Sequence, residues 1–65
     1  MKLTHGNSYK TRDGKNMVKV SLVSNGTNYK FGSVTPPYQV YLPTGHVLSE
    51  SIENDKDLVE LIEKE

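Results

Sequence analysis

Signals for tight turns recur so often in this chain that they limit the length of every element in its first 49 residues. They are Asp13-Gly14, Asn25-Gly26, Pro36-Pro37 and Pro43-Thr44-Gly45. Gly accepts the positive φ angles of tight turns, and Pro cannot donate a hydrogen bond to a strand ladder. The segments between these signals hold ten residues or fewer. The spacing therefore predicts short strands joined by hairpins.

Apolar and polar side chains alternate within these segments, as they do in strands that bury one face. Within residues 17–23, for example, Val18, Val20 and Leu22 share one face. We expect five strands, over residues 9–12, 17–23, 29–33, 38–42 and 46–48.

The local sequence also predicts how these strands are joined. Asp13-Gly14 suits a two-residue type I′ turn, which needs positive φ at both central residues, and Asn25-Gly26 repeats the pattern. Gly32 indicates a β-bulge or a close approach of another part of the chain. Pro36-Pro37 indicates a loop or a sheet edge, because neither residue can donate to a ladder.

The hydrophobic period changes in the acidic tail, residues 50–65. Asn54 is a suitable N-cap, and Asp57 lies in the first turn, where an acidic side chain favours the helix dipole. An apolar stripe follows at Leu58, Val59, Leu61 and Ile62. The tail therefore predicts a helix of about ten residues, which must dock on its own sheet or on another subunit to be stable.

These elements together predict a mainly β (α+β) fold in a single small domain, residues 1–65. The sheet spans 1–49, as a five-stranded antiparallel meander or a small open SH3-like barrel, and the tail adds the short C-terminal helix. A domain of 65 residues buries only about 60% of the surface of its unfolded chain. The chain has no Cys and so no disulfide to reinforce it. We therefore expect self-association, as a symmetric dimer.

The formal net charge of zero conceals a division between body and tail. Residues 1–49 hold six basic residues and one acidic residue, a balance of +5. Residues 50–65 hold two basic and seven acidic residues, a balance of −5. The body could bind anions, the tail could fold back over the body, or two copies could pair head to tail. Charges that only keep a small domain in solution are an equally simple explanation.

The side chains offer little for catalysis. The chain has two histidines, His5 and His46, no Cys, and no His or Glu spacing typical of a metal site. Ser33, His46 and Asp13 could form a triad on paper, but no spacing supports one. We expect a protein that is not an enzyme and uses neither a metal nor another cofactor.

Four residues are our candidates for contact with a ligand or partner: Arg12, Lys30, Tyr38 and Tyr41. Aromatic faces beside cations suit stacking on bases and neutralisation of phosphates. In a dimer these residues would line a groove shared by two subunits. Packing alone also selects Tyr within strands and Lys on their exposed faces, so a purely structural role stands beside the functional one.

Four segments carry a resemblance to a loose group of short bacteriophage proteins. The segments are Tyr9-Lys10-Thr11-Arg12-Asp13-Gly14-Lys15, Tyr29-Lys30-Phe31-Gly32, Tyr41-Leu42-Pro43-Thr44-Gly45 and Asp57-Leu58-Val59. The group typically reads Tyr-x-Thr-Arg-Asp-Gly, then a valine-rich strand, an aromatic strand with Gly, an aromatic-to-Gly turn and a closing Asp-Leu-Val. The likeness spans most of the chain, and Pro36-Pro37 and the acidic tail depart from it. It implies a small β fold and a phage setting, and it brings no activity to assign to any residue.

Small phage proteins without catalytic groups usually act by occupying a target. We therefore expect a binding protein that interferes with a host process such as antiviral defence, by masking a host protein or by sequestering a nucleotide signal. The alternative is a small nucleic-acid-binding module that uses a basic, Tyr-rich sheet. No apolar run approaches the roughly 20 residues of a membrane span, and the N-terminus lacks a secretory signal, so we expect no membrane association and a location in the cytoplasm of the infected bacterium.

Overall fold

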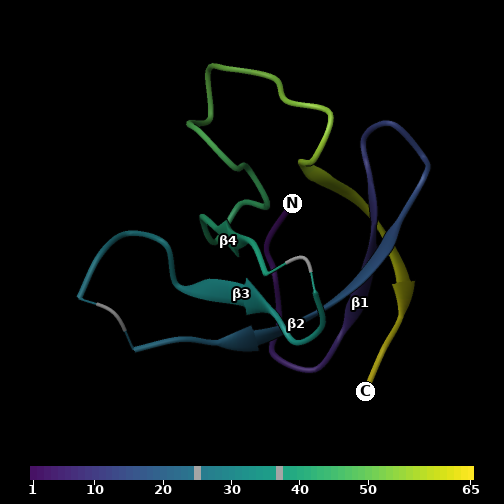
Figure 1. Cartoon of the computed structure of the whole chain (residues 1–65), viewed down its shortest axis with the longest axis horizontal. Coiled ribbons are helices and arrows are strands. Elements are labelled where there is room, and N and C mark those ends of the chain that lie inside the picture. Colours follow the sequence, from purple (N-terminus) through teal and green to yellow (C-terminus); the bar gives the residue numbers. More distant parts are fainter. Residues whose placement is uncertain (25, 37) are drawn as a thin grey trace.

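A computed structural model of the chain describes residues 1–24, 26–36 and 38–65. The described residues form five strands, which are β1 (Ser8–Thr11), β2 (Met17–Leu22), β3 (Phe31–Ser33), β4 (Val40–Tyr41) and β5 (Leu58–Glu63). They make one antiparallel sheet in the order β4-β3-β2-β1-β5 (Figure 1). The predicted mainly β fold with a five-stranded antiparallel sheet is confirmed. Among the described residues, no helix has the length and apolar character that crossing a bilayer requires.

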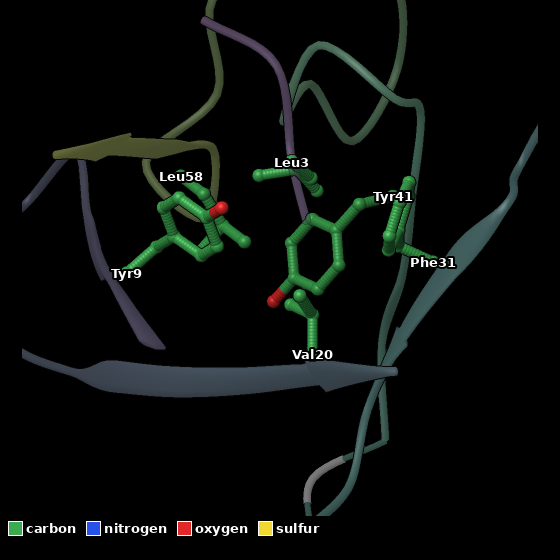
Figure 2. Packing of buried hydrophobic residues seen from close by; sticks show 6 residues of the cluster. All are labelled: Leu3, Tyr9, Val20, Phe31, Tyr41 and Leu58. Atoms are coloured by element: carbon green, nitrogen blue, oxygen red, sulfur yellow. The ribbon is translucent and has the colours of Figure 1, made fainter. Parts of the chain in front are cut away.

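Strand β2 belongs to both halves of the sheet. Its first residues pair with β1, so that Val18 lies opposite Tyr9, and its last residues pair with β3, so that Leu22 lies opposite Phe31. The sheet bends along β2 and encloses one core, to which all five strands contribute. The buried apolar side chains are Leu3, Tyr9, Val20, Phe31, Tyr41 and Leu58. Figure 2 shows Tyr9 and Leu58 on one side of this core and Phe31 and Tyr41 on the other.

The predicted hairpin between the first two strands is present, but its turn is not of type I′. A type I′ turn requires positive φ at both Asp13 and Gly14, and only Gly14 has it, at 75°. The N–H of Gly14 donates to the carbonyl of Thr11 (2.9 Å), and the N–H of Thr11 donates to the carbonyl of Asn16 (3.0 Å). Four residues, 12–15, therefore lie in the loop.

The side chain of Asp13 explains why the longer loop is preferred. Its Oδ1 accepts hydrogen bonds from the hydroxyl of Thr11 (2.6 Å) and from the N–H of Lys15 (3.0 Å). A carboxylate that accepts from its own backbone two residues on competes with the two-residue turn. These bonds also lower the pKa of Asp13, most strongly through the Thr11 hydroxyl.

The next two connections are described only in part, because Asn25 and Pro37 lie outside the described residues. Gly26 has a positive φ of 69°. Gly32 meets the close approach that its position predicts, since a Cβ there would lie 3.1 Å from a methyl carbon of Val23. The regular register of β3 against β2 shows no bulge at that point.

The predicted strand over residues 46–48 is wrong. A turn stands there instead, in which Gly45 N–H donates to Leu42 O (2.8 Å) and Leu42 N–H donates to His46 O (2.9 Å). The N–H of Val47 donates to the side chain of Asp57 (2.8 Å). A backbone donor that is committed to a carboxylate is not available to a strand ladder.

The predicted C-terminal helix is also wrong, because residues 58–63 form strand β5 beside β1 (Figure 1). Six residues of β5 lie opposite the four residues of β1. The register leaves Val59 and Ile62 without a partner, so each is the extra residue of a β-bulge.

Two bulges explain why the sequence of β5 is typical of a helix. Strand β5 consists of two similar triplets, Leu58-Val59-Glu60 and Leu61-Ile62-Glu63. The three residues of each triplet lie opposite two residues of β1. The apolar spacing that results matches a helical stripe. Because β5 pairs with β1, the acidic tail folds back on the basic body of its own chain, and Glu60 lies opposite Lys10.

Gly14 allows a direct test of this hairpin. No atom of the described residues lies within 4 Å of the position of an added Cβ, so substitution there changes only the backbone preference. We expect Gly14→Val to lower the free energy of unfolding by about 1–2 kcal/mol, because a β-branched residue is disfavoured at positive φ. Gly14→Asn should cost less, since Asn tolerates this region. Urea unfolding of the two variants compares them, and equal stabilities would contradict the described loop.

Candidate functional site

The most buried charged group among the described residues is the carboxylate of Asp57, at 1% exposure. Its Oδ1 accepts from the N–H of Val47 (2.8 Å), and its Oδ2 accepts from the N–H of Asn54 (2.9 Å) and from Nη2 of Arg12 (3.2 Å). Two backbone donors and one guanidinium therefore replace the water that burial removes.

The balance of these contacts lowers the pKa of Asp57. Burial by itself raises the pKa, because it disfavours the charged form. The hydrogen bonds from Val47, Asn54 and Arg12 together outweigh burial, so the pKa lies below the ordinary value of 3.8. Asp57 is therefore charged in the folded protein at neutral pH.

Arg12, a predicted ligand contact, is held by this carboxylate. Its side chain is 33% exposed and also lies 4.0 Å from Oε1 of Glu53. The backbone N–H of Arg12 donates to the carbonyl of Asp57 (2.7 Å). The Thr-Arg-Asp-Gly and Asp-Leu-Val segments that carry the phage resemblance thus meet in space, and the fold gives both a structural role.

The other three predicted site residues lie apart. Lys30 is exposed and directly precedes β3, whereas Tyr38 is 75% exposed and precedes β4. Phe31 pairs with Tyr41 in an antiparallel register. Lys30 and Tyr38 therefore lie at opposite ends of the β3–β4 pair. Tyr41 is 2% exposed and belongs to the core. One copy of the chain does not bring the four residues together, and the groove predicted between two copies stays a prediction.

The expected basic, Tyr-rich face is also divided by the fold. Tyr9 and Tyr41 are buried, so neither ring is available for a base to stack on. The hydroxyl of Tyr29 donates to the carbonyl of Leu48 (3.3 Å). Lys10 lies opposite Glu60 in the β1–β5 register. Tyr38 and Lys30 are exposed, as contacts with a base or a phosphate require.

An open pocket of about 240 Å³ lies at one end of the core. The end of the β1–β2 hairpin, the β3–β4 connection and the loop before β5 surround it. The described residues that line it are Thr11, Asn16, Met17, Val18, Ser33, Thr35, Pro36, Gln39, Tyr41 and Lys56. Tyr41 is thus the predicted site residue that contributes to the pocket.

The two buried tyrosines differ in what their hydroxyls bind. The hydroxyl of Tyr9 accepts from the N–H of Thr4 (2.9 Å) and from Nδ2 of Asn7 (3.5 Å). The hydroxyl of Tyr41 makes no hydrogen bond with any described residue. Figure 2 shows the Tyr41 ring crossing the core with its hydroxyl toward Val20. Burial raises the pKa of Tyr41, so this hydroxyl keeps its proton and can donate.

A second candidate surface lies on β5, the strand that ends the sheet. Val59 and Leu61 are each 41% exposed, and Ile62 is 42% exposed. Glu60 and Glu63 lie between and beside them. We call Val59, Glu60, Ile62 and Glu63 the β5 stripe.

Sequence reasoning missed most of the residues at these sites. Asn16, Gln39 and Lys56 line the pocket from three different connections, and no local pattern marks such residues. Asp57 carries no signal of burial, because its position suits the first turn of a helix equally well. Comparison of the chain with protein-family models, with curated proteins and with solved structures finds no match.

Replacement of Asp57 should weaken the fold and change its response to acid. We expect Asp57→Asn to lower the free energy of unfolding at neutral pH by about 3 kcal/mol, because Arg12 and two N–H groups lose their shared charged acceptor. A lowered folded-state pKa means that the carboxylate stabilises the fold above about pH 4 and that this stability is lost as pH falls through the folded pKa.

Urea unfolding of both proteins from about pH 2.5 to 7 measures this effect. The variant should lose less stability on acidification than the wild type, and Asp13 supplies the acid dependence that remains in both. An identical loss in the two proteins would show that Asp57 is not the titrating group.

The two tyrosine hydroxyls make a matched pair for substitution. Tyr9→Phe should lower the free energy of unfolding by about 1–3 kcal/mol, because it leaves the N–H of Thr4 without its acceptor. Tyr41→Phe removes a hydroxyl with no partner among the described residues and should change stability by less than about 0.5 kcal/mol. Thermal unfolding distinguishes them, and a Tyr41→Phe variant as unstable as Tyr9→Phe would show that the Tyr41 hydroxyl has a structural partner.

Proposed function

We propose that this chain is a non-enzymatic accessory protein of a bacteriophage that masks a host protein and thereby interferes with a host process such as antiviral defence. The observation that carries this proposal is the exposure of Val59 and Ile62 on the bulges of β5. The resemblance to short phage proteins supplies the setting.

The bulges give the β5 stripe its character. A bulge can turn a side chain toward a binding surface. The extra residue of a bulge does not pack in the core here, so the core does not require it to be apolar. Val59 and Ile62 are nevertheless apolar, and each is followed by a glutamate. The target surface that fits them is apolar with Lys or Arg at its margin. A second copy of β5 fits less well, because it would bring glutamates together.

The strand arrangement supports a small open SH3-like barrel as the finer description of the fold, because β2 is shared between two halves that enclose one core. The nucleic-acid-binding alternative has less support, since Tyr9 and Tyr41 are buried and Arg12 is paired with Asp57. Dimerisation stays a prediction, and light scattering at micromolar concentration tests it.

A pull-down from infected cells tests the masking function when it includes matched variants. Tagged wild type, Ile62→Lys and Leu22→Lys are compared, because Leu22 is 62% exposed at the far end of β2 and undergoes the same change. We expect a target that binds wild type and Leu22→Lys equally and binds Ile62→Lys at least tenfold more weakly. Thermal unfolding confirms that the variants are folded.

Two outcomes would contradict the proposal. One is a wild-type protein that captures no target, and the other is a target that binds Ile62→Lys as well as wild type. Because opposite charges accelerate encounter, the association rate with the captured target should also fall as salt rises.

A further inference from the structure

The pocket beside Tyr41 has the size of a small ring system. A cavity of about 150 Å³ lined by apolar side chains is enough for benzene, whereas drug-sized ligands occupy about 300 Å³ or more. The pocket here holds about 240 Å³. It therefore fits one or two fused rings and leaves any larger attached group outside.

The wall of the pocket also includes a residue with an unused hydrogen-bond donor, Tyr41. The hydroxyls of Thr11 and Ser33 cannot donate to a ligand without breaking a hydrogen bond. The Thr11 hydroxyl donates to Asp13 Oδ1 and the Ser33 hydroxyl to the carbonyl of Thr35, each at 2.6 Å. Tyr41 is 2% exposed, and its hydroxyl donates to none of the described residues. None of the described buried polar side-chain atoms lacks a partner, so the unpaired Tyr41 hydroxyl keeps some contact with solvent and is free to donate to a ligand that supplies an acceptor.

The charges around the pocket favour a neutral group inside it. None of the described lining residues is acidic, and Lys56 is the basic one. Lys56 is close enough to Asp13 to lower the pKa of that carboxylate, so its charge is partly balanced at the rim. Lys56 remains able to meet an anionic group that extends out of the pocket.

The remaining lining residues suit a flat heterocycle. Met17, Val18 and Pro36 provide apolar surface for ring faces, while Asn16 and Gln39 carry amides that can both donate and accept. The amide nitrogen of Gln39 donates to the carbonyl of Val40 (3.0 Å), which leaves its oxygen as an acceptor. Amide side chains of this kind read the edges of nucleobases.

From these observations we propose that the pocket at Tyr41 binds the heterocyclic base of a nucleoside, with the Tyr41 hydroxyl donating to an acceptor on the ring and the amides of Asn16 and Gln39 facing its edge. The described lining of the pocket contains no residue of the β5 stripe, so this proposal does not depend on the masking function. The base could belong to a free nucleoside, to a nucleotide or to a single strand, and the chemistry inside the pocket is the same for all three.

Titration of the full-length, ¹⁵N-labelled protein with adenosine, guanosine, cytidine and uridine tests this proposal by NMR. We expect at least one nucleoside to shift the side-chain amide signals of Asn16 and Gln39 in a saturable manner. Tyr41→Phe should weaken that binding about tenfold, which corresponds to the loss of one hydrogen bond. Ile62→Lys should leave it unchanged, which separates this site from the β5 stripe.

Four further probes identify the source of the base and the specificity of the pocket. Tighter binding of the 5′-monophosphate that Lys56→Gln abolishes would indicate a nucleotide, and tighter binding of a short oligonucleotide that falls steeply with salt would indicate a single strand. Equal affinities for the nucleoside, the 5′-monophosphate and the oligonucleotide would indicate that the pocket binds the base alone. The proposal is overturned if no nucleoside shifts these signals, if Tyr41→Phe binds as well as wild type, or if p-cresol and propionamide, which mimic protein side chains, bind as tightly as the nucleosides.

Discussion

The hydrogen bonds of the buried Asp57 carboxylate hold the C-terminal strand against the rest of the protein. Removing a carboxylate from water is costly, and the cost is offset only where several donors meet the charge. Here the donors come from Arg12 in the β1–β2 loop, from Val47 after β4 and from Asn54 just before Asp57 itself. One side chain thus joins the β1–β2 loop to two points of the β4–β5 connection.

The position of β5 follows from that arrangement. Asp57 directly precedes β5, and its backbone carbonyl accepts from the N–H of Arg12, so the tail enters the sheet at the end of β1. Leu58 then reaches the core at 2% exposure, and the two bulges leave Val59 and Ile62 outside it. The contact between Asp57 and Arg12 therefore places Leu58 in the core and leaves Val59 and Ile62 on the surface. Closure of the core end beside the hairpin remains incomplete, and the pocket at Tyr41 lies there.

The features that could be predicted from the sequence are those whose causes are local. The β1–β2 hairpin follows from alternation on either side of Asp13-Gly14, although the side-chain bonds of Asp13 select a longer loop than the dipeptide alone suggests. The strand character of residues 58–63 could not be predicted, because a bulge is defined by the partner strand and the spacing of Leu58 and Leu61 fits a helix equally well. Asp57 and Arg12 are 45 residues apart, so their pairing has no local signal. The sequence predicts that Tyr41 offers an aromatic face, whereas the fold buries its ring and leaves its hydroxyl without a partner among the described residues.

Asp57 thus positions residues 58–63 beside β1 as a bulged strand. Proton–proton contacts measured by NMR on the full chain at neutral pH test it most directly. The structure predicts cross-strand contacts between Tyr9 and Leu61 and between Thr11 and Leu58, with extended backbone couplings through residues 58–63. Contacts between residues three apart along 55–63, with the small couplings of a helix and no contact to β1, would contradict the placement of β5 in the sheet.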